Sequence, residues 1–364
     1  MCRIYNTIGC LNTIQSRLVE NNIDDFNSLN DLNDFTNTYN VSRQHIILKH
    51  TSLLEEEKIA LDKEISEFNL TISDRVKELK EELRAKLDFY NREIDTLSLT
   101  TPNLTKAIKS YWTNLILFFK FWFVQILTYF RIHLFLYNAK KILISKSKRL
   151  HYFSINFQDA LAESSSYSCQ MLDKKKEIIE QLKNTIYGAY GENQVEKELG
   201  KLSDDYTLIN DFCFTFDSPL YYNGDYIKSI QIDHLLICTS GIFLIETKNW
   251  SNRSINSLDL RSPVQQILRT NYALYKILSQ NNKSRWNFTR NHWGDRKIPL
   301  KNIITFTGTV PKEQFQFIKI LGINELLNYI KYFSSNFTNN ETEQISDFLL
   351  NLSKQKKIIS KLTI

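Results

Sequence analysis

The stretch IQIDHLLICTSGIFLIETKNW, residues 230–250, decides the fold of this chain. Two apolar runs, 232–238 and 242–245, flank a short turn that begins with Thr239 and Ser240. Apolar strands that meet across a tight turn are typical of a β-hairpin. Both faces of the two strands are apolar, which predicts a sheet covered on both sides.

Three charged side chains interrupt this hairpin. A two-residue turn sets Asp233 directly opposite Glu246, and cross-strand partners point to the same face about 5 Å apart. Lys248 lies two residues beyond Glu246 and therefore shares that face. Alternation places Ile232, with Leu236, on the other face. The sequence thus predicts two carboxylates and one ammonium at a single position on the sheet.

Facing carboxylates repel each other in a low-dielectric site unless a cation lies between them. Hard oxygen ligands favour Mg²⁺ or Mn²⁺, and such an ion can activate a water and stabilise the charge of a phosphodiester transition state. The alternative is a salt-bridged triad on an edge strand, with Lys248 compensating two acids that face solvent. Spacing alone leaves both interpretations open.

The segments around the hairpin predict a compact α/β domain. We expect a helix at 190–201, a strand at 206–216 and the two strands of the hairpin at 230–248. A helix at 263–279, a strand at 301–308 and a helix at 323–333 follow. This order is typical of a mixed sheet flanked by helices.

The pattern of residues then resembles a known family. Gly191-Glu192 near a helix start, the I-D-H run at 232–234, the G-x-F-x-I-E-T-K-N-W run at 241–250, and Pro263 and Gln265 opening a helix look like the NERD (nuclease-related) domain of the PD-(D/E)xK nuclease superfamily. The resemblance covers residues 188–335. It implies a restriction-endonuclease-like core in which Asp233 and Glu246 hold metal, Lys248 assists catalysis and Glu192 completes the metal or water shell.

Neighbouring residues suggest further roles. Gln265 is a candidate for contacting a phosphate or the attacking water, or else forms a hydrogen bond at the helix start. We expect His234 to point away from the acids as a structural histidine, because neighbouring strand residues face opposite sides. Trp250 is expected to pack.

A basic, aromatic stretch follows at 281–301. It carries Arg285, Arg290 and Lys297, the candidate nucleic-acid-binding residues, interleaved with tryptophan and phenylalanine. Cations that neutralise phosphates beside rings that stack on bases are typical of nucleic-acid contact. A solvated polar insertion is the alternative.

The N-terminal half is predicted to be all α. We divide it into a polar, partly helical segment (1–50), a coiled-coil-like helix with apolar residues at steps of three and four (51–99), an aromatic amphipathic helix (104–148) and a connecting helix (150–187), and we expect a C-terminal helix at 336–364. Pro102, in the sequence TTPN, breaks the helical pattern between the second and third of these segments.

Residues 110–141 are long and apolar enough to span a bilayer, yet Lys120, Gln125 and Arg131 lie within them. A charge at mid-bilayer costs on the order of 3 kcal/mol, which argues against a lone span. A helix lying in the membrane interface and a helix packed against protein in a homo-oligomer both remain open.

Composition sets few limits on function. The 364 residues carry a net charge of +6, which favours anionic partners mildly. Five scattered cysteines without C-x-x-C spacing and an N-terminus without secretory features predict a cytoplasmic protein. If residues 110–141 contact a membrane rather than protein, we expect them to do so on its cytoplasmic side. The sequence as a whole favours a Mg²⁺- or Mn²⁺-dependent nuclease acting on DNA. The alternative function is a non-cleaving nucleic-acid-binding protein or adaptor in which the helical arm is the working part.

Overall fold

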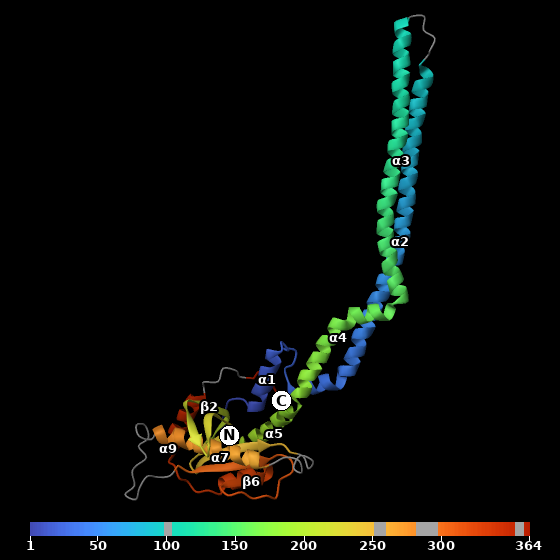
Figure 1. Cartoon of the computed structure of the whole chain (residues 1–364). Helices are drawn as coiled ribbons and strands as arrows, with labels where there is room; N and C mark the ends of the chain where they lie inside the picture. The colour runs from blue at the N-terminus through green and yellow to red at the C-terminus, as the bar shows by residue number, and fades with distance from the viewer. Residues whose placement is uncertain (98–103, 251–259, 282–297, 354–359) are drawn as a thin grey trace. The chain divides into compact units, whose positions relative to one another are not determined.

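The computed structural model describes residues 1–97, 104–250, 260–281, 298–353 and 360–364, and Figure 1 shows the chain. The chain divides into two compact units. The first comprises Met1–Tyr39 with Asp173–Ile364, and the second comprises Asn40–Leu172.

A six-stranded sheet forms the centre of the first unit. Its strands lie in the order of the sequence: β1 (Arg3–Tyr5), β2 (Thr207–Tyr222), β3 (Asp225–Cys238), β4 (Gly241–Lys248), β5 (Leu300–Phe306) and β6 (Ile318–Gly322). The β2–β3 and β3–β4 pairs are antiparallel, whereas β1–β2, β4–β5 and β5–β6 are parallel. The predicted mixed α/β sheet is confirmed, and β1 and β6 are additions that the sequence pattern did not indicate.

The hairpin has the predicted register. Cys238 pairs with Gly241, and the ladder continues to His234 opposite Ile245. Gly241 has a φ of +140°, and a Cβ at that position would lie 2.7 Å from the carbonyl oxygen of Pro299. Glycine therefore allows the turn to lie against the chain that enters β5.

Helices cover both faces of the sheet. On one face α7 (Arg261–Asn281) and α9 (Asn339–Ser353) pack on residues such as Leu235 and Leu244. On the other, α5 (Lys183–Leu199) and α8 (Ile323–Lys331) pack on residues such as Leu236 and Phe243. A further helix, α1 (Gly9–Glu20), packs against α5 through a separate apolar cluster.

Strand alternation breaks beside the predicted site, and this break overturns one expectation. Ile232 lies in the core under α7 together with Leu235, not on the opposite face. In the register of the β2–β3 ladder Asp211 lies opposite Asp233, but these two residues are not paired. Asp211 also has a φ of +48°. Such irregularities shift the alternation by one residue and redirect side chains next to functional sites.

The second unit is a helical hairpin. Most of α2 (Leu29–Thr96) runs antiparallel to α3 (Leu104–Ile155), and α4 (Phe157–Gln181) follows (Figure 1). Lys146 Nζ lies 2.6 Å from Glu64 Oε2, and Arg149 pairs with Glu57, which fixes the antiparallel register. Phe153 and Ala160 pack on Leu54 where α4 begins.

The predicted apolar stripe on α2 is confirmed. Each of its members is at least partly buried, whereas the residues between them are exposed: Ile65, Phe68, Ile72, Val76, Leu79, Leu83, Leu87, Tyr90, Ile94 and Leu97. The helix begins earlier than expected, at Leu29. Ser28 Oγ accepts the backbone N–H of Asp31 and Asp31 Oδ2 accepts that of Ser28, a reciprocal cap that starts the helix there.

Candidate active site

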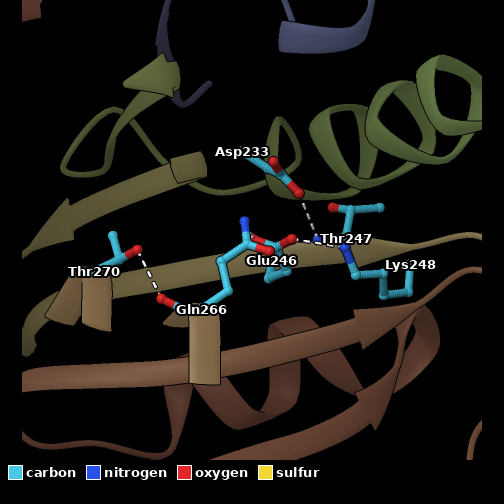
Figure 2. A network of polar contacts seen from close by, with 6 residues as sticks. All are labelled: Asp233, Glu246, Thr247, Lys248, Gln266 and Thr270. Carbon is cyan, nitrogen blue, oxygen red and sulfur yellow. Dashed lines mark hydrogen bonds and ion pairs between the residues drawn. The ribbon is translucent and has the colours of Figure 1, made fainter. Parts of the chain in front are cut away.

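The three predicted residues of the hairpin gather at one end of the β3–β4 ladder (Figure 2). Lys248 Nζ lies 2.7 Å from Glu246 Oε1, and Asp233 Oδ2 accepts a hydrogen bond of 2.8 Å from the backbone N–H of Thr247. Glu246 is only 6% exposed, whereas Asp233 and Lys248 are partly exposed. The cluster therefore combines a buried acid with groups that solvent and a substrate can reach.

The cluster has more acids than bases. Glu192, on α5, is buried close enough for its charge to act on Asp233. Burial raises the pKa of Asp233 well above its usual value, and the charges of Glu246 and Glu192 raise it further. Burial also raises the pKa of Glu192. Lys248 brings one positive charge to the cluster, which offsets these carboxylates only in part.

Lys248 stays protonated in this setting. Burial alone would lower its pKa, but Glu246 and Asp233 raise the pKa above the usual value for lysine. A protonated lysine beside the carboxylates can neutralise phosphate charge or orient a nucleophile. It does not act as a free amine.

Helix α7 closes the site from one side. Gln266 Nε2 lies 3.5 Å from Glu246 Oε2, and its backbone carbonyl accepts the hydroxyl proton of Thr270 (Figure 2). A side-chain amide at this point adds a neutral donor and acceptor beside the acids. The site thus draws on β3, β4, α5 and α7.

The family model of the nuclease-related domain (NERD) matches residues 187–307. The chain therefore carries a NERD domain. The match spans the elements from α5 to β5 and includes Glu192, Asp233, Glu246 and Lys248. No curated protein and no solved structure matches the chain.

The remaining predicted residues lie elsewhere in the structure or outside its described part. Gln265 is exposed on α7, and it is the next residue, Gln266, that contacts Glu246. Arg285, Arg290 and Lys297 lie outside the described residues.

His234 has the expected structural role. It is fully buried, its Nδ1 lies 2.7 Å from Asn210 Oδ1, and burial lowers its pKa to about 3. Trp250 packs edge-on against Phe306, with ring centroids 5.5 Å apart, as expected of a core residue.

Residues far from the NERD match in sequence complete the site. The backbone N–H of Cys10, in the first turn of α1, donates a hydrogen bond of 3.1 Å to Glu192 Oε2. Burial raises the pKa of Glu192 more than this contact with the N-terminus of α1 lowers it, so the pKa lies above its usual value. Burial raises the pKa of the Cys10 thiol, and Glu192 raises it further, so the thiol stays protonated.

A second polar network, centred on Asp211, lies so close to Glu192 that, besides burial, the charge of Asp211 raises the pKa of Glu192. Asp211 accepts hydrogen bonds from Asn12 Nδ2 at 2.8 Å and from Gln231 Nε2 at 2.7 Å. Asn12 Oδ1 in turn accepts the backbone N–H of Ser360 near the C-terminus. These contacts tie both ends of the chain to the irregular part of the β2–β3 ladder.

The donor chemistry of the cluster is that of a site for a hard divalent cation, because carboxylate oxygens are the ligands such ions prefer. Among the described residues, no group of three or more His, Cys, Asp or Glu side chains is placed so that it could hold a metal ion. Mg²⁺ keeps several waters and needs only one or two protein carboxylates. The partly exposed Asp233 and the buried Glu246 are the candidates for such a pair.

Proposed function

We propose that the NERD domain is a nuclease that hydrolyses phosphodiester bonds of DNA with the help of Mg²⁺ or Mn²⁺ held by Asp233 and Glu246. One observation carries the proposal: the partly buried Asp233 carboxyl lies beside Glu246 and Glu192, and the charge of Lys248 offsets theirs only in part. Burying several carboxylates close together lowers the stability of the fold. Such clusters, with their shifted pKa values, are typical of functional sites.

Each residue has a role in this proposal. Asp233 and Glu246 hold the ion, which when bound activates water and stabilises the charge of the phosphodiester transition state. Lys248, protonated beside Glu246, neutralises a phosphate oxygen or orients the attacking water. Glu192 accepts a proton or orients the water from α5, and Gln266 contributes a hydrogen bond. The net charge of +6 favours a polyanionic substrate.

A cleavage assay tests the proposal. The full chain is incubated with single- and double-stranded DNA and RNA, with Mg²⁺, Mn²⁺ or a chelator. The expected result is cleavage of DNA that requires the metal and is lost in Asp233→Ala. The matched control is Asp217→Ala, which removes an exposed acid from β2 and should cut like the wild type.

Two outcomes would contradict the proposal. Cleavage that Asp233→Ala leaves intact would place the catalytic site elsewhere. Binding of nucleic acid without cutting by the wild type in any metal would favour the second function, an adaptor whose helical arm is the working part.

A further inference from the structure

The face of α3 turned away from α2 carries a continuous apolar stripe. Its members recur at steps of three and four and are each between 51% and 69% exposed: Trp112, Ile116, Phe119, Phe123, Ile126, Phe130, Leu134 and Tyr137. Phe118, Trp122 and Tyr129 widen this outer stripe and are also exposed. A patch of this size on a soluble surface marks an interaction site.

The charges of α3 indicate what covers the outer stripe. Between Leu104 and Ile155 the sequence contains no Asp or Glu, but it contains nine cations: Lys106, Lys109, Lys120, Arg131, Lys140, Lys141, Lys146, Lys148 and Arg149. Aromatic rings flanked by cations alone are typical of helices that lie in the headgroup region of an anionic membrane.

A second copy of α3 fits this face less well. Helices that pair through a stripe of this spacing usually carry charges of both signs beside it, which form interhelical ion pairs. Two copies of α3 facing each other would instead bring together cations with no acid on either helix. An anionic lipid surface complements both the rings and the cations.

Helix α3 is long and apolar enough to cross a membrane, and only 6% of its most apolar window is buried. The charges of α2, which packs beside it, nevertheless argue against a membrane span. In the register set by Lys146 with Glu64, the aromatic part of α3 lies beside the last third of α2. That part of α2 carries thirteen charged residues: Asp74, Arg75, Lys77, Glu78, Lys80, Glu81, Glu82, Arg84, Lys86, Asp88, Arg92, Glu93 and Asp95.

A hairpin inserted across the bilayer would draw these charges into hydrocarbon, where each carries an insertion penalty. A hairpin lying on the membrane surface keeps these charges in water, because they belong to α2, which packs on the face of α3 opposite the outer stripe. We infer that the α2–α3 hairpin docks flat on an anionic lipid surface, with the outer stripe of α3 buried among the headgroups and α2 facing water.

Co-sedimentation of the full chain with vesicles tests this inference. We expect it to sediment with vesicles that contain phosphatidylglycerol, to bind pure phosphatidylcholine vesicles more weakly, and to be released by high salt. Replacing Phe119, Phe123 and Phe130 with Glu should lower partitioning by about tenfold or more, and so should the milder replacement of the same residues with Ser.

The matched control lies on the other helix of the same hairpin. Replacing Ile59, Leu70 and Phe89, which are equally exposed on α2, with Glu should leave partitioning unchanged. Replacing Lys109, Lys140 and Lys141 with Gln should reduce the preference for phosphatidylglycerol while leaving the weaker binding to phosphatidylcholine in place. Circular dichroism of each variant confirms that the helices are retained.

Several results would overturn the inference. A wild-type chain that ignores phosphatidylglycerol vesicles, or an α2 control that loses binding as the α3 variant does, removes the lipid surface as the partner. Equal, salt-resistant binding to both kinds of vesicle would indicate insertion across the bilayer. An oligomer in solution that only the α3 variants dissociate, without vesicle binding, would show that a second copy covers the outer stripe.

Discussion

Asp233→Asn should make the metal-free protein more stable while it removes the response to Mg²⁺. The pKa of this carboxyl is raised in the folded state by burial and by Glu246 and Glu192, so its ionised form opposes folding at neutral pH. Asn carries no charge, and its amide oxygen can still accept the N–H of Thr247. Each unit by which the folded pKa exceeds the unfolded value corresponds to about 1.4 kcal/mol.

The sign of the pH dependence follows from the same shift. A carboxyl with a raised folded pKa costs no stability below its unfolded pKa, and the cost grows as the pH rises towards the folded pKa. The free energy of unfolding of Asp233→Asn should therefore equal that of the wild type in acid and exceed it by about 1 kcal/mol or more at pH 7.

The response to metal works in the opposite direction. An ion that binds only the folded state at ten times its dissociation constant adds about 1.4 kcal/mol, or a rise of about 3–6 °C in the melting temperature of a domain of this size. The wild type should show that rise in Mg²⁺, and Asp233→Asn should not.

Thermal unfolding with Mg²⁺ and with a chelator, at pH 4 and pH 7, measures both effects. If Asp233→Asn is less stable than the wild type at pH 7 without metal, the charge of Asp233 does not oppose folding. If Mg²⁺ raises both melting temperatures equally, Asp233 does not bind the ion.

Three further predictions concern the same domain. Lys248→Met leaves Glu246 buried without its cation and should lower the free energy of unfolding by about 1–3 kcal/mol in thermal unfolding. Mg²⁺ should restore part of this loss. A loss that Mg²⁺ does not change would argue against a metal at this point. The buried His234 has a folded pKa of about 3 and so stays unprotonated at pH values where the unfolded chain binds a proton. Between pH 6.5 and pH 5 the wild type should therefore lose about 1.6 kcal/mol relative to His234→Gln in urea unfolding. Identical pH profiles would exclude this role for the histidine. Gly241→Ala should lower stability by about 1–3 kcal/mol, because the added Cβ meets Pro299 and the backbone has a positive φ; unchanged stability would mean that the turn adapts.

The hairpin shows what the sequence could predict. Its register depends only on the turn length and on alternation, both of which are local, so the meeting of Glu246 with Lys248 followed from counting residues. The apolar stripe of α2 was equally readable, because a period of three and four residues has one structural meaning over a long helix.

The parts that were missed depend on contacts between distant segments. Cys10 meets Glu192 across 182 positions of sequence, and no local pattern indicates such a contact. Ile232 was placed on the wrong face because strict alternation takes no account of the irregularity at Asp211. The strands β1 and β6 have three and five residues, too few to show a period.

Gln266 is a different case, because the signal was present. A proline followed three residues later by glutamine, Pro263 and Gln266, opens α7. Three residues is almost one helical turn, so the side chain of Gln266 returns near the face that Pro263 begins. Gln265 lies about 100° away from Gln266 around the helix, so its side chain points in another direction.

The number of Mn²⁺ ions that the full chain binds, measured by electron paramagnetic resonance titration of free Mn²⁺, tests the proposed metal site most directly. We predict that the wild type binds an ion which a variant carrying both Asp233→Asn and Glu246→Gln does not, and that Mg²⁺ competes for it. Equal Mn²⁺ binding by the two proteins would contradict the claim that these carboxylates hold a catalytic metal.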